Sequence, residues 1–245
     1  MVFATSGTDS SAAIESLAQD GQSVVVVELF TSQGCSSCPP ADKLLGELAD
    51  KPGILALSYH VDYWDYLGWK DPYSSALATE RQRAYAQNLK ARGLYTPQAV
   101  IDGRLETVGS SRSKVLSLIA ESLKDGPDRD VLIEVVETDG GYGIVVDGAQ
   151  GTTLKLVEYL PLAETAIPRG ENRGRTLTEH NVVTDLKSLG NLRDKVQRVE
   201  VGAGDLRSDR AYAVLVQVRG QGPILAAAQV RRSQVLTSSL HSPGR

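Results

Sequence analysis

Residues 24–42 read V-V-V-V-E-L-F-T-S-Q-G-C-S-S-C-P-P-A-D. The run Val24–Phe30 is β-branched and almost continuously apolar, a pattern typical of a strand that is buried on both faces of a sheet. Both cysteines of the chain, Cys35 and Cys38, follow in a short polar loop, and a helical repeat of apolar residues begins at Ala41. The stretch therefore predicts a strand, a C-x-x-C pair and a helix in direct succession.

A C-x-x-C pair at the start of a helix is typical of a redox-active dithiol, because the positive end of the helix dipole stabilises the reactive thiolate. The same pair could be half of a zinc site, but a structural zinc needs four ligands. The chain has no second C-x-x-C, and its histidines, His60, His180 and His241, show no ligand spacing. We therefore predict a redox dithiol and no metal site; an inert vestige of such a motif is the other alternative.

The composition fits a soluble globular protein, with 245 residues, 41% hydrophobic and 23% charged. A net charge of −4 gives no general attraction to nucleic acid or anionic lipid. No apolar stretch approaches the roughly 20 residues that span a bilayer. The amino end lacks the basic start and apolar core of a signal peptide. We expect either a cytosolic protein or one whose targeting segment has been replaced.

Up to residue 124 the pattern alternates between strands and helices. We predict strands at 24–30, 54–61, 98–101 and 105–108, and helices at about 41–50, 75–91 and 111–124. Asp102-Gly103 between the last two strands is a strong hairpin signal. This order favours an α/β sheet covered by helices on both faces.

After Pro127 the apolar period changes from 3.6 to 2. Seven short strands are predicted, at 131–136, 143–146, 154–159, 176–186, 196–201, 211–218 and 224–230. Short strands separated by glycine-rich turns, without a helical pattern, indicate a mostly antiparallel β-sandwich.

The first part resembles the thioredoxin superfamily over roughly residues 22 to 124, because Thr96-Pro97 leads into an apolar strand after the same order of elements. The resemblance implies a cis Thr96–Pro97 bond facing the dithiol, with the Thr96 backbone offered to an incoming strand. Within the superfamily the chain is similar to a bacterial thioredoxin-like family of unknown function. The motifs that carry this similarity lie at residues 28–42, 59–72, 95–98 and 169–178.

The predicted organisation is an α/β thioredoxin-like domain followed by a β-sandwich domain. The boundaries are a flexible N-terminal tail at 1–21, the thioredoxin-like domain at 22–126, the sandwich at 127–235 and a C-terminal tail at 236–245. Relatives commonly carry export signals, so the resemblance implies a periplasmic or secreted protein.

Two departures from thioredoxin concern the dithiol itself. Gly34 stands where thioredoxin has a tryptophan. Prolines 39 and 40 are tolerable only in the first helical turn, so we place Cys38 near the N-cap and expect Cys35 to be the more exposed cysteine outside the helix. Glu28 is either a solvent-touching carboxylate at a strand end or a partly buried general base for Cys38, its pKa raised by burial.

A cluster of aromatic and polar residues follows the strand at 54–61. His60, Asp62 and Trp64 either form a wall of a substrate groove or belong to a cover over the sheet edge, together with Tyr63, Asp65 and Trp69. The loop at 169–175 carries three arginines and is either solvated, a link between the two parts, or a grip for an anion.

These features favour a thiol–disulfide oxidoreductase acting on a protein or small-molecule disulfide or dithiol, without a dissociable cofactor. Cys35 would attack the substrate disulfide and Cys38 would resolve the mixed disulfide. Glu28 would assist proton removal, and Thr96 and Pro97 would present the substrate backbone. One alternative is a binding module whose dithiol is incidental. Another is a Cu(I)-handling protein with Cys35, Cys38 and His60 as ligands.

Overall fold

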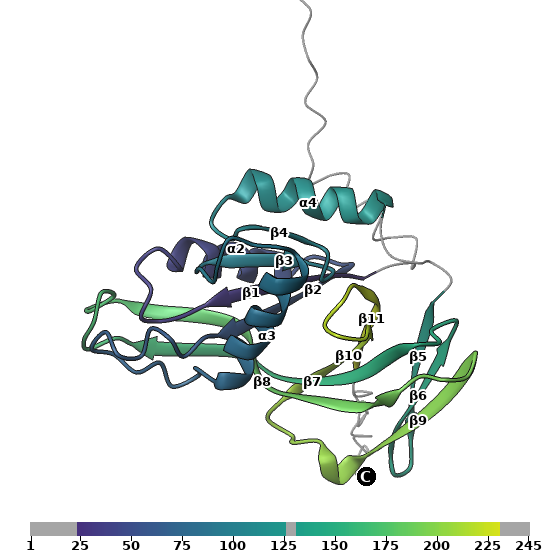
Figure 1. Ribbon diagram of the computed structural model, residues 1–245. Coiled ribbons are helices and arrows are strands. Elements are labelled where there is room, and N and C mark those ends of the chain that lie inside the picture. The colour runs from purple at the N-terminus through teal and green to yellow at the C-terminus, as the bar shows by residue number, and fades with distance from the viewer. Residues whose placement is uncertain (1–23, 126–130, 231–245) are drawn as a thin grey trace, which may run out of the picture.

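The computed structural model describes residues 24–125 and 131–230 (Figure 1). These residues form a β-rich structure with one mixed eight-stranded sheet, one three-stranded sheet and few helices. The predicted tails at 1–21 and 236–245 lie outside the described residues, as does most of the predicted boundary near 126. No helix among the described residues is long and apolar enough to cross a membrane.

The first half has the predicted order of elements. They are β1 (Val25–Thr31), α2 (Pro39–Ala49), β2 (Ile54–His60), α3 (Ala76–Asn88), β3 (Gln98–Ile101), β4 (Leu105–Val108) and α4 (Arg112–Asp125). β1 pairs in parallel with β2 and antiparallel with β3, and β3 and β4 form the predicted hairpin. Asp102 and Gly103 both have positive φ, at 47° and 63°, which suits the tight turn between these strands.

Alternate side chains of β1 enter different cores, as the two-residue period of a strand requires. Val25, Val27 and Leu29 pack with α2 and α4 on one face. Val26 and Phe30 pack on the other face, where α3 and residues of the second half lie. β1 is buried along its whole length, which explains why its sequence shows no polar alternation.

All seven strands predicted for the second half are present. They are β5 (Leu132–Thr138), β6 (Gly141–Asp147), β7 (Thr152–Ala166), β8 (Thr176–Asn191), β9 (Val196–Gly202), β10 (Ala211–Val218) and β11 (Ile224–Val230). β7 and β8 are longer than predicted, because their pairing continues past register shifts at Leu154/Lys155 and Glu158/Tyr159. They form a long hairpin that extends beside β2 and α2 (Figure 1).

One of the two sheets in the predicted sandwich is continuous with the sheet of the first half. β5, β6 and β9 form the three-stranded sheet, and their apolar side chains share a core with those of β7 and β10. β7, β8, β10 and β11 belong to the eight-stranded sheet, which joins β2 through the pair Ser58–Val182. One sheet thus runs through both predicted parts, and the division of the chain into two domains stays a prediction.

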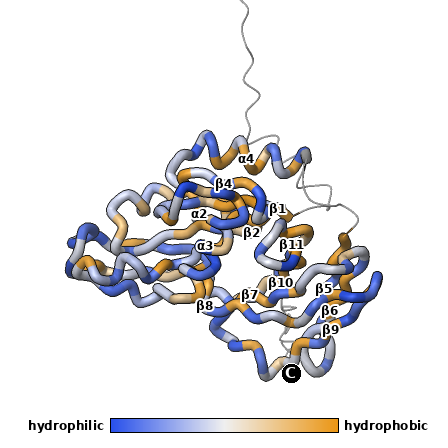
Figure 2. The backbone as a smooth tube through the Cα atoms, viewed as in Figure 1, coloured by the Kyte–Doolittle hydropathy of each residue, from blue (hydrophilic) through white to orange (hydrophobic). Residues whose placement is uncertain are grey.

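The hydropathy of the chain follows this layering (Figure 2). Hydrophobic residues recur along one side of α4, and its buried positions Val115, Leu118 and Ile119 belong to the core with β1. The inner strands β1 and β2 are buried throughout. The dithiol therefore follows a strand that is buried along its whole length.

Candidate functional site

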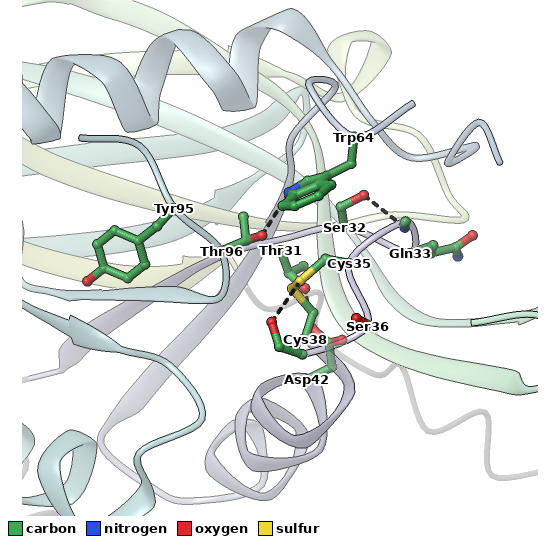
Figure 3. The surroundings of a disulfide bond; sticks show 12 residues. Thr31, Ser32, Gln33, Cys35, Ser36, Cys38, Asp42, Trp64, Tyr95 and Thr96 are labelled. Carbon is green, nitrogen blue, oxygen red and sulfur yellow. Dashed lines mark hydrogen bonds between the residues drawn. A yellow bond between two sulfur atoms is a disulfide. The ribbon is translucent and has the colours of Figure 1, made fainter. Parts of the chain in front are cut away.

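Cys35 and Cys38 form a disulfide at the junction of β1 and α2 (Figure 3). Their Cα atoms are 5.4 Å apart, within the usual range for a disulfide. Two successive tight turns bring them together, because the Cys35 amide donates to the Ser32 carbonyl and the Cys38 amide donates to the Cys35 carbonyl. Cys38 is the N-cap of α2 and Pro39 is its first residue, which confirms that part of the prediction.

Cys35 lies outside α2, as predicted, but it is buried almost as completely as Cys38. Cys35 is 1% exposed and Cys38 is fully buried. The loop between β7 and β8 covers this part of the chain: the Asn172 side-chain amide donates to the carbonyls of Gln33 and Cys35, at 2.9 and 3.0 Å. Between residues 31 and 38, the exposed residues are the two serines that separate the cysteines, Ser36 and Ser37.

This loop links the two halves through Asn172 and Glu171, whereas the prediction considered its arginines. Asn172 is fully buried, and its Oδ1 accepts a hydrogen bond from Arg175. Glu171 accepts a hydrogen bond from the Ser36 amide at 3.2 Å. The side chains of Arg169, Arg173 and Arg175 are exposed.

Trp64 and Thr96 meet beside the disulfide (Figure 3). The indole Nε1 of Trp64 donates to the Thr96 hydroxyl at 2.8 Å. The Thr96–Pro97 bond is cis, as predicted. The structure thus brings two of the predicted substrate-binding residues together at the site, and their role in binding stays a prediction.

The other two predicted substrate-binding residues lie in different surroundings. His60 is 1% exposed, and its Nδ1 is 2.7 Å from a carboxylate oxygen of Asp71. Asp62 is half-buried and accepts a hydrogen bond from the hydroxyl of Thr79 in α3. His60 therefore belongs to the interior beneath the dithiol loop, and the carboxylate of Asp62 is engaged by α3.

Glu28 is not placed to act as a base for Cys38. Its neighbours Val27 and Leu29 face α2, so its side chain points to the opposite face of the sheet. There its carboxylate accepts hydrogen bonds from Arg81 Nε and Nη2, at 2.7 and 3.0 Å, and from the Tyr85 hydroxyl at 2.5 Å. Glu28 is fully buried, so the solvent-touching alternative is wrong too.

The buried acid on the dithiol side is Asp42, which the sequence analysis missed. It lies one helical turn after Cys38, and its amide donates to the Cys38 carbonyl at 3.1 Å. The Thr31 hydroxyl donates to Asp42 Oδ1 at 2.7 Å. Burial raises the pKa of Asp42 from 3.8 to about 7, although the Thr31 hydrogen bond and the charge of His60 oppose the rise. The four-residue spacing from Cys38 was a usable signal, since it places both side chains on one helix face.

Asp42 also borders a cavity of about 410 Å³ between α2 and β8. Pro39 lines the same cavity at the end nearest the disulfide, and His180 lines it from β8. Asp42 is therefore buried in the protein but lines a cavity that water molecules can enter.

Few backbone donors are left at the start of α2 for a thiolate. Pro39 and Pro40 have no N–H group, and the amides of Ala41 and Asp42 both donate to the Cys38 carbonyl. The N-terminus of α2 therefore stabilises a thiolate less than a helix start with free N–H groups would. No group of three or more histidine, cysteine or acidic side chains in the described ranges is arranged to hold a metal ion.

A family model described as a protein of unknown function (DUF1223) matches residues 26–218. The chain belongs to the DUF1223 family. The family match spans β1 to β10 and so includes both the disulfide and the covering loop. A search of the curated proteins found no match.

Two solved structures are similar to this DUF1223 chain. A crystal structure of a protein from Agrobacterium tumefaciens is 28% identical, with a TM-score of 0.74 over 85% of this chain and 95% of that one. The protein HBP35 of Porphyromonas gingivalis is 16% identical, with a TM-score of 0.54 over 91% of this chain and 80% of that one. The second likeness concerns the fold alone.

Proposed function

We propose that the protein is a thiol–disulfide oxidoreductase whose redox couple is the Cys35–Cys38 pair. The observation that carries the proposal is the buried residue Asp42, which lies one helical turn after Cys38 in the surroundings of the disulfide (Figure 3) and whose carboxyl pKa is raised by burial to about 7. A proton acceptor of that pKa suits a thiol that must lose its proton at neutral pH. The strand–helix order and the cis Thr96–Pro97 bond add support, because they match the thioredoxin-like resemblance.

The reduced protein would act in two steps. The Cys35 thiolate attacks a substrate disulfide, forms a mixed disulfide and releases the first substrate thiolate. Asp42 then accepts the Cys38 proton, and the Cys38 thiolate attacks Cys35 Sγ. This step forms the Cys35–Cys38 disulfide and releases the second substrate thiolate. The substrate gains two electrons and the protein loses two, and the same steps run in reverse when the protein is the oxidant.

We assign the attack on the substrate to Cys35 because its sulfur contacts an exposed residue. Its Sγ lies 3.4 Å from the hydroxyl of Ser37, an exposed residue that can donate a hydrogen bond to a thiolate. Trp64 and Thr96 lie beside the same pair and form the proposed wall for the substrate. Because Cys35 is 1% exposed, attack on a protein disulfide requires the Asn172 loop to move.

Trapping of the mixed disulfide tests the assignment of the two cysteines. A Cys38→Ser variant incubated with oxidised glutathione should accumulate a glutathione adduct on Cys35, detected by mass spectrometry. The matched Cys35→Ser variant should form far less adduct. Equal adduct on both variants would contradict the assignment, and no adduct on either would contradict the proposed function.

A binding module with a structural disulfide is the second candidate, and the burial of both cysteines favours it. Such a module would keep its ligand binding in a Cys35→Ser/Cys38→Ser double variant, whereas exchange activity would be lost. A disulfide of either kind suits an oxidising compartment, so we propose a periplasmic or secreted location. Fractionation of the source cells, with a periplasmic marker enzyme as control, tests the location.

A further inference from the structure

Beneath the dithiol loop lies a group of buried polar side chains that the exchange steps do not use. They come from four places in the chain: Gln33 after β1, His60 at the end of β2, Asp71 in the following loop and Glu179 in β8. Each is 2% exposed or less. Buried polar groups normally have hydrogen-bond partners, so each unpartnered atom here needs an explanation.

Hydrogen bonds hold most of this group in fixed positions. Asp71 Oδ2 accepts from His60 Nδ1 at 2.7 Å and from the Gln33 amide at 2.8 Å. The Gln33 side chain donates to Glu179 Oε1 at 3.0 Å and accepts from Trp69 Nε1 at 2.9 Å. Gln33 therefore ties Asp71 and Glu179 to the segment that carries the disulfide.

Two polar atoms of the group have no hydrogen-bond partner among the described residues. His60 Nε2 and Glu179 Oε2 are both buried, and no described residue hydrogen-bonds to either. The Asp71 contact fixes the Nδ1 proton of His60, so a protonated ring still has an Nε2–H to donate. Glu179 Oε2 is an acceptor. A donor and an acceptor of this kind are the partners that a buried water molecule needs.

Asp42 belongs to the same buried surroundings. Thr31, which donates to Asp42, is the register partner of His60, so both side chains point to the α2 side of the sheet. Burial alone would lower the pKa of His60, but the Asp71 carboxylate, with help from Asp42 and Glu179, raises it. Burial raises the pKa of Glu179. When the ring of His60 is protonated, its charge favours ionised Asp42, and the charge of Glu179 opposes it.

We propose that His60 and Glu179 bind an internal water molecule between His60 Nε2 and Glu179 Oε2, and that they are positioning residues which set the protonation of Asp42. This inference rests on the proposed function, in which Asp42 accepts the Cys38 proton. Asp71 orients the ring of His60, and Gln33 links the water site to the dithiol loop. Protonated His60 increases the fraction of Asp42 that is ionised at neutral pH and so able to accept a proton, and Glu179 limits that effect.

The test measures the pH profile of ring closure, the first-order step that forms the Cys35–Cys38 disulfide after reaction with oxidised glutathione. His60→Asn keeps an amide donor for Asp71 but removes Nε2 and the positive charge. Its inflection should move up by about half a pH unit or more. Glu179→Gln keeps an acceptor for Gln33 and should move the inflection down. The double variant should lie between the two, and Asp185→Asn, a carboxylate farther along the same strand, should match the wild type.

Failure of the inference and failure of the proposed function give different results. A wild-type protein that never closes the disulfide would refute the proposed function. A wild type that closes it, with inflections unmoved by His60→Asn and Glu179→Gln, would refute the inference alone. A crystal structure of the wild type supplies a measurement that needs no variant. Water within hydrogen-bond distance of both Nε2 and Oε2 supports the site, and a direct contact between them or an empty space overturns it.

Discussion

Removal of the Asn172 side chain should open the disulfide to reducing agents. The Asn172 amide donates to the carbonyls of Gln33 and Cys35 and is fully buried between the loop and the dithiol segment. Asn172→Ala removes both hydrogen bonds and leaves two carbonyls without that donor. The loop between β7 and β8 should therefore leave its closed position more often.

The size of the effect follows from the two hydrogen bonds. Each contributes about 0.5–1.5 kcal/mol net, so the closed position loses about 1–3 kcal/mol. Such a change raises the open population about 5- to 150-fold. Reduction by an agent that needs the open loop should accelerate by the same factor, because its rate is proportional to that population.

The assay compares two reductants of different size, dithiothreitol and a reduced thioredoxin. Free thiols are trapped with a maleimide reagent at timed intervals, and the fraction reduced is read from the mass shift. Asn172→Ala should accelerate reduction by thioredoxin more than reduction by dithiothreitol. Arg173→Ala is the matched control, since Arg173 is an exposed side chain in the same loop. Equal rates for Asn172→Ala and wild type with both reductants would refute the loop as the cover of the disulfide.

Three further predictions concern Asp42, Glu28 and Pro40. Because burial raises the Asp42 pKa from 3.8 to about 7, folding favours its protonated form, and this contribution to stability is present below pH 4 and lost as the pH rises through 7. Asp42→Asn should thus be more stable than wild type at pH 8 by up to about 4 kcal/mol in urea unfolding, while ring closure slows; a variant of unchanged stability would contradict the burial argument. Glu28→Gln should lower the free energy of unfolding by about 3–5 kcal/mol in the same assay, because it leaves the buried Arg81 charge uncompensated. The pH profile of ring closure should match that of the wild type; a shifted profile would show that Glu28 does act on the dithiol. Pro40→Ala restores an N–H group to the first turn of α2 and should lower the Cys35 pKa by about 0.2–0.7 units in a thiolate absorbance titration. An unchanged or higher pKa would show that the missing N–H groups do not weaken the stabilisation of the thiolate.

Local patterns were sufficient to predict most elements of the fold. The apolar run of β1, the Asp102-Gly103 turn and the two prolines after Cys38 each constrain the backbone directly, and the structure has the expected element at each place. The lengths of β7 and β8 were not predictable in this way. Their pairing continues through a register shift and is stabilised by contacts with α2 and β2, which depend on distant parts of the chain.

The candidate site shows the same division between local and distant effects. The dithiol and its place at the helix start follow from spacing. The covering role of Asn172 does not, because it depends on residues 137 and 139 positions earlier in the chain. The prediction placed the side chain of Glu28 on the dithiol side of the sheet, whereas it points to the opposite side. A polar residue in an otherwise apolar strand does not by itself show which face of the sheet carries its partner. The sequence does not show that Arg81 in α3 is the one that faces it.

A redox titration shows whether the Cys35–Cys38 pair is a reversible redox couple in the folded protein. The folded protein is equilibrated in dithiothreitol buffers of graded potential, thiols are trapped, and native structure is monitored by near-ultraviolet circular dichroism. We expect a single reversible two-electron transition in the folded state, with the same midpoint from the reducing and oxidising directions. A disulfide that is reduced only when the protein unfolds, or that does not re-form, would contradict it.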